Sequence, residues 1–170
     1  MMTEYTMPIE IERKFLVDTT LWHPEPALGI RYRQGYLSTD PERVVRVRTA
    51  GAAGFLTIKG KTVGTERPEF EYPIPLVDAD AILDHLCVRP LVEKVRYREL
   101  VGGRTWEIDV FEGENAGLVV AEVELPTATA DVILPPWAGA EVSNDPRYFN
   151  SNLAAHPFSR WNTNGDARAG

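Results

Sequence analysis

Hydrophobic and polar residues alternate along most of this chain, in runs that are separated by turn-forming residues. Alternation with a period of two is typical of a β-strand that has one apolar face. A weaker candidate of this kind covers residues 31–37. The clear runs are residues 7–17, 44–49, 55–59, 69–74, 93–99, 105–111 and 118–125. Eight strands can close a small barrel, so the pattern predicts an all-β fold.

Apolar residues at helical spacing are rare in the sequence. Residues 78–86 have them, and Asp78 stands where an N-cap is expected. We expect a second, weaker helix after Pro126 and a short one through residues 150–154. The fold predicted from these patterns is a β-barrel with a few peripheral helices.

Length and composition add limits to this picture. A chain of 170 residues suits one domain, which we place at residues 7–155, with a C-terminal tail over 156–170 that we expect to be loose from about Ser159. The single cysteine, Cys87, excludes an internal disulfide framework and favours a cytoplasmic location. We expect neither a signal peptide nor a membrane-spanning helix. The net charge of -7 argues against nucleic acid or an anionic membrane as the main partner.

Charged residues share one face of each predicted strand, because successive residues of a strand point to opposite faces. Most of these faces carry a single sign. The acidic positions are Glu10, Glu12, Glu69, Glu71, Glu107, Asp109, Glu122 and Glu124. The basic positions are Lys14, Arg46, Arg48, Lys59, Lys94, Arg96 and Arg98. Like charges two residues apart on one face repel, so these faces need partners of opposite sign.

Two closed arrangements are compatible with these faces. With the apolar faces inward, the chain forms an ordinary small barrel and its charges lie in solvent. With the charged faces inward, the barrel encloses a polar tunnel. Its apolar outer faces are then covered by helices or by the second subunit of a homodimer. A single acidic pair is more typical of the first arrangement, but the same design in seven runs favours the second.

A tunnel that carries both signs of charge suits one class of ligand. Carboxylates are the preferred ligands of Mg²⁺ and Mn²⁺. Arginine and lysine bind phosphate oxygens, arginine often through two hydrogen bonds. A chain of phosphates with a bound metal ion meets both requirements, whereas an apolar ligand or a free nucleobase does not.

Several of these segments resemble a known family. Glu10, Glu12 and Lys14 stand in the E-x-E-x-K spacing of the CYTH superfamily, also called triphosphate tunnel metalloenzymes. The similarity continues through the ordered set RQGYL, VRVR, TIKG, EFEY, EKVRY, WEIDVF and VAEVEL. The chain is most similar to the compact bacterial inorganic triphosphatases. The resemblance implies an eight-stranded antiparallel closed barrel around a hydrophilic tunnel, in which a small-molecule triphosphate binds with Mg²⁺ or Mn²⁺.

The resemblance also implies roles for individual residues. The family's metal-binding carboxylates correspond to Glu10, Glu12, Glu122 and Glu124. Its phosphate-binding positions correspond to Arg46, Arg48, Lys59, Lys94 and Arg96. Lys14 and Tyr36 are similar to a catalytic lysine–tyrosine pair that helps to activate the attacking water. We expect the remaining tunnel carboxylates to orient these cations: Glu69, Glu71, Glu107 and Asp109.

The activity expected from these features is metal-dependent hydrolysis of inorganic triphosphate or a related polyphosphate or organic triphosphate, with water attacking the terminal phosphoanhydride. Three alternatives stay open at this point: an adenylyl cyclase or a thiamine triphosphatase on the same barrel, and a polyphosphate-binding module without catalysis. One departure from the family is visible, because Pro146 stands where relatives often have a lysine, with Arg147 beside it.

Overall fold

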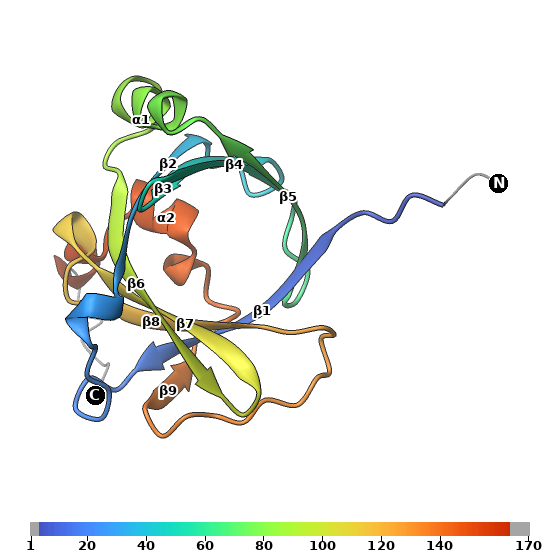
Figure 1. The fold of residues 1–170 in the computed structure, drawn as a ribbon, viewed down its shortest axis with the longest axis vertical. Helices are drawn as coiled ribbons and strands as arrows, with labels where there is room; N and C mark the ends of the chain where they lie inside the picture. The colour runs from blue at the N-terminus through green and yellow to red at the C-terminus, as the bar shows by residue number, and fades with distance from the viewer. Residues whose placement is uncertain (1–3, 164–170) are drawn as a thin grey trace.

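The computed structural model describes residues 4–163 of the chain. Nine strands form one antiparallel sheet in the order β5-β4-β3-β2-β6-β7-β8-β1-β9. Strand β1 also pairs with β5, and this pairing closes β1 to β8 into a barrel, which Figure 1 shows end-on. The predicted eight-stranded antiparallel closed barrel is therefore confirmed.

Each of the eight predicted runs is a strand. The barrel strands are β1 (Ile9–Val17), β2 (Ile30–Ser38), β3 (Val44–Ala50), β4 (Ala53–Lys59), β5 (Glu66–Ile74), β6 (Val92–Val101), β7 (Arg104–Phe111) and β8 (Val119–Glu124). A ninth strand, β9 (Ala138–Glu141), pairs with β1 and was not predicted. Its sequence, AGAE, has no apolar alternation to mark it as a strand.

The ladder that closes the barrel is short, and we call it the seam. It consists of three residue pairs, Ile9 with Pro68, Glu10 with Arg67 and Ile11 with Glu66. The ladder between β6 and β7, by comparison, has eight pairs. The barrel is thus closed by fewer backbone hydrogen bonds than hold its other walls together.

Two α-helices lie against the barrel. Helix α1 (Leu76–His85) packs over β3 and β4, where Ala79 and Leu83 are fully buried. The prediction that Asp78 caps this helix is wrong. Pro75 occupies the cap position and its carbonyl accepts the N–H of Asp78, so the helix begins before the predicted cap.

The predictions for the C-terminal third had mixed outcomes. The short helix expected at 150–154 is confirmed as α2 (Asn150–Ala155). The prediction of a helix after Pro126 is wrong, because residues 126–137 form turns and irregular chain. Pro135 and Pro136 disfavour a helix in this segment.

Four 3₁₀ turns complete the described elements: η1 (Pro26–Leu28), η2 (Gly113–Asn115), η3 (Pro146–Tyr148) and η4 (Phe158–Thr163). The last of these begins inside the expected tail, 156–170. Phe158 and Trp161 pack against a buried apolar cluster, so a loose tail is the wrong description there. The rest of that expected tail, 164–170, lies outside the described residues.

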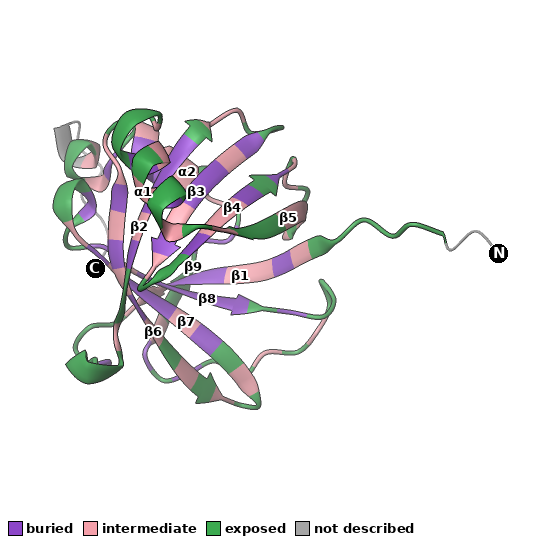
Figure 2. Cartoon of the chain, turned by 45° about the horizontal axis from the view of Figure 1, so that its top comes forward, coloured by how far each residue is buried: buried purple, intermediate pink, exposed green. Residues whose placement is uncertain are grey.

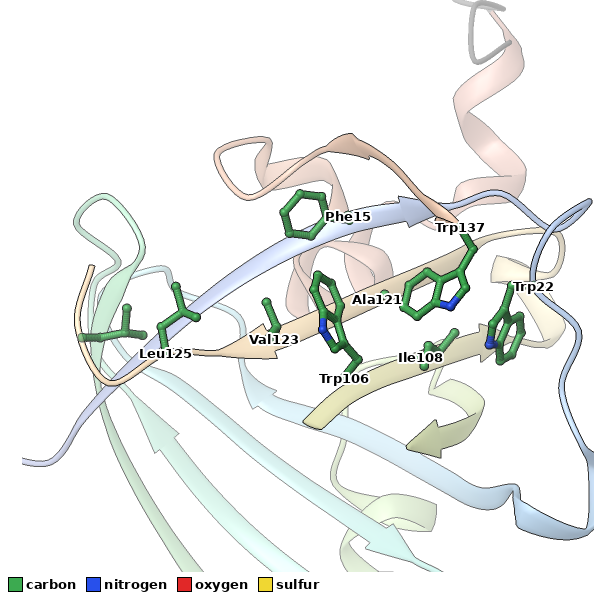
Figure 3. Packing of buried hydrophobic residues seen from close by; sticks show 9 residues of the cluster. Phe15, Trp22, Trp106, Ile108, Ala121, Val123, Leu125 and Trp137 are labelled. Atoms are coloured by element: carbon green, nitrogen blue, oxygen red, sulfur yellow. The ribbon is translucent and has the colours of Figure 1, made fainter. Parts of the chain in front are cut away.

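The apolar outer face of β1, β7 and β8 is covered by other parts of the same chain. Figure 3 shows Trp106 of β7 between Phe15 and Trp137, and its ring centroid lies 5.5 Å from each of theirs. Trp106 is completely buried. Aromatic side chains of this size supply much of the apolar burial in a small domain. In Figure 2, buried positions recur along most barrel strands, whereas β5 has none.

No helix among the described residues is both long and apolar enough to cross a membrane.

Candidate active site

A pocket opens into the interior of the barrel, and charged and other polar side chains form most of its wall. Seven of the predicted site residues line it: Glu10, Glu12, Lys14, Tyr36, Arg46, Lys59 and Glu122. They come from five different strands, β1, β2, β3, β4 and β8. The prediction that the charged faces point inward therefore places acidic and basic groups around one pocket.

Lys14 and Glu122 face each other across the β1–β8 ladder. The ammonium nitrogen of Lys14 lies 3.1 Å from Oε1 of Glu122, and both side chains are buried. Burial alone would lower the pKa of Lys14, but the carboxylates of Glu122 and Glu12 outweigh it and raise that pKa. The same kind of balance keeps the pKa of Glu122 well below its usual range, against burial, chiefly through Lys14 and Arg96.

Glu12 is the carboxyl group of the pocket with no cation at ion-pair distance in the described part of the chain, although Lys14 and Lys59 attract it from farther away. Among the described residues, no lysine or arginine forms an ion pair with it. Burial, together with the negative charges of Glu122 and Glu10, raises its pKa to about 8. Two carboxylates that disfavour each other's charge become favourable when a cation lies between them.

Glu10 has the opposite environment. Its Oε2 accepts hydrogen bonds from Lys59 Nζ at 2.9 Å and from Arg67 Nε at 3.3 Å. Burial tends to raise the pKa of Glu10, but Lys59 and Arg67 lower it to about 2. The two acidic residues of the E-x-E-x-K pattern are therefore not equivalent, since Glu10 is compensated by cations and Glu12 is not.

Arg46 and Arg48 share Glu71 as their partner. Nη2 of Arg46 lies 3.2 Å from Oε2 of Glu71, and Nη2 of Arg48 lies 3.3 Å from the same oxygen. Thr57 donates a further hydrogen bond to this oxygen and accepts one from Arg46. Glu71 thus pairs with two guanidinium groups at once.

Asp109 plays the same part for the cations of β6. It is fully buried, and its two oxygens lie 2.7 Å from Lys94 Nζ and 2.7 Å from Arg96 Nε. Lys94 also donates to Asn150 at the start of α2. Burial lowers the pKa of Lys94 to about 8, although Asp109 opposes this change. Lys94 and Arg96 do not line the pocket itself, and they lie behind it in this buried network.

Tyr36 reaches the pocket from β2, where its hydroxyl accepts a hydrogen bond from Gln34 Nε2 at 3.0 Å. Both side chains are almost fully buried. Burial raises the pKa of the Tyr36 phenol, although Arg46, Arg67 and Lys14 oppose the rise. The phenol is therefore neutral and can donate its own proton in a hydrogen bond.

Glu124 and Glu107 do not line this pocket, although Oε1 of Glu107 lies 3.1 Å from Nη1 of Arg96. They line a separate surface hollow with Arg104, and Glu124 is exposed. Partial burial and the negative charge of Glu10 raise the pKa of Glu124. Of the four predicted metal ligands, the structure brings Glu10, Glu12 and Glu122 together in the pocket and leaves Glu124 beside Glu12 on the neighbouring strand.

The metal-binding chemistry of the pocket depends on Glu12. Within residues 4–163, no three acidic, histidine or cysteine side chains stand close enough to form a preformed metal site. The donor set nevertheless fits a hard divalent cation, because Glu12 is an uncompensated carboxylate beside Glu122 and Glu10. Glu122 and Glu10, in contrast, already have lysine or arginine partners in this structure.

Sequence reasoning missed several pocket residues. Arg67 lies on β5 with the same alternation as Glu69 and Glu71, which was a usable signal, but the strand was expected to start only at Glu69. Thr62, Gly64, Thr65, Ser143, Phe149, Asn150 and Ser151 also line the pocket. They lie outside the barrel strands, where alternation gives no indication. Arg147, beside Pro146, forms an exposed ion pair with Asp145.

Comparison with known proteins gives consistent matches over this fold. A sequence model of the CYTH domain matches residues 8–156. The inorganic triphosphatase of Acetivibrio thermocellus is 47% identical over 152 residues, covering 89% of this chain and 97% of that protein. The inorganic triphosphatase of Nitrosomonas europaea is 39% identical over 150 residues, covering 85% and 96%. A crystal structure of an inorganic triphosphatase superimposes with a TM-score of 0.60 at 38% identity, covering 85% of this chain and 93% of that one.

Proposed function

The chain belongs to the CYTH domain family, and from that premise we propose that it is a phosphoanhydride hydrolase that acts on inorganic triphosphate with a divalent metal ion. Relatives at 47% and 39% identity are named inorganic triphosphatases. The observation that carries the proposal is the pocket itself. There, the uncompensated carboxylate of Glu12 lies among Lys14, Arg46 and Lys59, so that one site meets the needs of both a metal ion and phosphate.

The cations of the pocket bind the substrate in this proposal. Arg46 and Lys59 are directed by Glu71 and Glu10 and contact phosphate oxygens first. Arg48, Lys94 and Arg96 extend the positive charge along the interior. Because these groups are held by carboxylates before substrate arrives, they need little reorganisation when charge develops on the transferring phosphoryl group.

Glu12 and Glu122 would hold the metal ion, with Glu10 and Glu124 as the neighbouring carboxylates. Either Mg²⁺ or Mn²⁺ suits these oxygen ligands. When bound, the ion supplies neutralisation of the phosphate charge. Three further carboxylates hold the cations around this site. Glu69 lies 2.9 Å from Lys59, Glu107 lies 3.1 Å from Arg96, and Asp109 lies 2.7 Å from Lys94.

Lys14 and Tyr36 are the proposed catalytic pair. Both reach the pocket, Lys14 as an ammonium beside Glu122 and Tyr36 as a neutral phenol. In these protonation states, each group can donate a hydrogen bond to a phosphate oxygen or orient the attacking water. A cytoplasmic location, expected from the sequence, and a homodimer, one of two ways the sequence left open to cover the apolar outer faces, also remain proposals.

A phosphate-release assay tests the function. The purified full chain is mixed with tripolyphosphate and either Mg²⁺ or Mn²⁺, and chelator replaces the metal in the control. We expect orthophosphate and pyrophosphate as products, and no release in chelator. The same assay with ATP separates the alternatives, since a cyclase forms cyclic AMP and pyrophosphate. Binding of tripolyphosphate without release of any product would instead leave a binding module.

A further inference from the structure

Arg67 stands at the rim of the pocket, and no role follows for it from the sequence pattern. It pairs with Glu10 across the seam and shares the inward face of β5 with Glu69 and Glu71. Its Nε donates to Oε2 of Glu10 at 3.3 Å, while its side chain is only 19% exposed. Its guanidinium therefore has a fixed position in the pocket wall.

Arg67 keeps unused hydrogen-bond donors. Among the described residues, only its Nε has a partner, so Nη1 and Nη2 are unpaired. Thr62 and Thr65 line the same pocket from the loop between β4 and β5, residues 60–65. Neither threonine hydroxyl has a partner in the described part of the chain. The carbonyl of Thr65 accepts the N–H of Glu12 at 3.2 Å, which fixes this loop beside β1.

These donors match one kind of ligand group. The two Nη groups of a guanidinium fit two oxygens of a phosphate, and hydroxyl groups complete its hydrogen bonds. The nearest acceptor, Glu10, already accepts from Lys59 as well as from Arg67. An uncharged organic substituent placed here would offer Arg67 and the two hydroxyls only neutral acceptors, whose hydrogen bonds are weaker than those of charged phosphate oxygens.

We propose that Arg67, with Thr62 and Thr65, binds a phosphate group of the substrate at the rim and makes the enzyme prefer inorganic triphosphate to nucleoside triphosphates; this inference rests on the proposed function. Inorganic triphosphate has a phosphate at each end, so it fills the rim in either direction. A nucleoside triphosphate offers the rim donors only the neutral acceptors of its nucleoside if the nucleoside lies there. In the reverse direction, its nucleoside must enter an interior occupied by the buried Lys94–Asp109–Arg96 ion pairs.

The test compares two substrates in one set of variants. The kcat and KM for tripolyphosphate and for ATP are measured with the same metal for wild type, Arg67→Gln and Arg67→Lys. Arg13→Gln is the matched control, because Arg13 lies on the adjacent strand but pairs with Glu141 outside the pocket. For Arg67→Gln, we expect kcat/KM for tripolyphosphate to fall about 10- to 100-fold, mainly through KM. For ATP, the change should stay within about 3-fold.

Arg67→Lys should lie between wild type and Arg67→Gln, since it keeps the charge but loses the two-pronged hydrogen bonding. Arg13→Gln should match wild type on both substrates. An equal loss for tripolyphosphate and ATP would overturn the specificity role, and an unchanged KM for tripolyphosphate would overturn the phosphate contact. Thr65→Val removes one rim hydroxyl without changing a residue of the seam. If Arg67→Gln fails to fold, the kcat and KM of Thr65→Val for tripolyphosphate and ATP are compared with those of wild type instead.

Calorimetric titration of tripolyphosphate in chelator separates this inference from the proposed function. We expect the Kd of Arg67→Gln to rise about 10-fold over wild type, because binding then depends on the protein's own donors. If wild type binds tripolyphosphate more tightly than Arg67→Gln but releases no phosphate with metal present, the phosphate-binding role of Arg67 stands and the proposed function fails. If wild type is active and both proteins bind tripolyphosphate equally, the phosphate-binding role of Arg67 is wrong and the proposed function stands.

Discussion

The ammonium nitrogen of Lys14 lies 3.1 Å from Oε1 of Glu122, directly across the ladder between β1 and β8. Both groups are buried, so their mutual attraction is only weakly screened by solvent. The pair raises the pKa of Lys14, although burial acts in the opposite direction. Lys14 therefore enters the reaction as a cation, and a neutral amine that accepts a proton from water is disfavoured.

Replacing Lys14 tests this point. Lys14→Arg keeps the positive charge, whereas Lys14→Met removes it with little change in volume. We expect Lys14→Arg to retain kcat within about 10-fold of wild type and Lys14→Met to lose about 100-fold or more. The measurement is kcat between pH 6 and 10 with tripolyphosphate. If Lys14→Arg is as inactive as Lys14→Met and the alkaline limb of the profile is lost, Lys14 acts as a general base after all.

The stability of the metal-free protein should fall with rising pH because of Glu12. The folded-state pKa of Glu12 is about 8, above its ordinary value of 4.5. Between these values, the folded protein binds a proton that the unfolded chain has released, so the free energy of unfolding decreases as the pH rises. The stabilising contribution is complete below pH 4.5 and is lost above pH 8.

Thermal unfolding in chelator at pH 5 to 9 measures this effect. Glu12→Gln cannot ionise, so its Tm should fall less over this range than that of wild type. Glu42→Gln is the control, because Glu42 is exposed outside the pocket. Equal slopes for wild type and Glu12→Gln would show that another group is responsible.

The two acidic residues of β8 should differ in their effect on metal binding. Glu122 is buried in the pocket, whereas Glu124 is exposed beside a separate hollow. We expect Glu122→Gln to raise the metal concentration required for half-maximal rate by about 10- to 100-fold, and Glu124→Gln to raise it less. Titration of activity with Mg²⁺ and Mn²⁺ checks the order. The reverse order would place the ion at the hollow near Glu107.

Asp109 should contribute strongly to stability, because it is the shared partner of two buried cations. In Asp109→Asn, Lys94 and Arg96 lose their compensating charge, and such losses cost about 3–5 kcal/mol. Glu112→Gln breaks the exposed ion pair with Arg31 and should cost less than about 1 kcal/mol. Urea unfolding of both variants in chelator provides the comparison. Similar free energies of unfolding would contradict a structural role for Asp109.

The barrel strands and the inward direction of their charges were accessible from the sequence, since alternation is a property of near neighbours in the chain. Strand β9 was not, because its pairing with β1 depends on distant contacts such as the burial of Trp137. The start of β5 was missed at Pro68, which normally disfavours a strand interior. Here its carbonyl accepts the N–H of Gly60, so the strand continues through it.

The partners of the site residues were less accessible. Which carboxylate compensates which cation depends on the neighbours that the closed sheet creates, such as β1 with β8 and β2 with β6. The different environments of Glu10 and Glu12 follow from Arg67 and Lys59, which reach Glu10 across and beside the seam. Identical residues two positions apart in the sequence thus acquire opposite pKa shifts through tertiary structure alone.

The three-pair seam has a consequence for how the barrel moves. Backbone amides in a short ladder open more often than those in a long one, so residues 9–11 should exchange hydrogen for deuterium faster than the β6–β7 hairpin. Glu10 and Arg67 belong to both the seam and the pocket wall. If a polyanion binds between β1 and β5, it therefore opposes the separation of these strands. We expect the barrel with bound polyanion to be more rigid than the empty barrel.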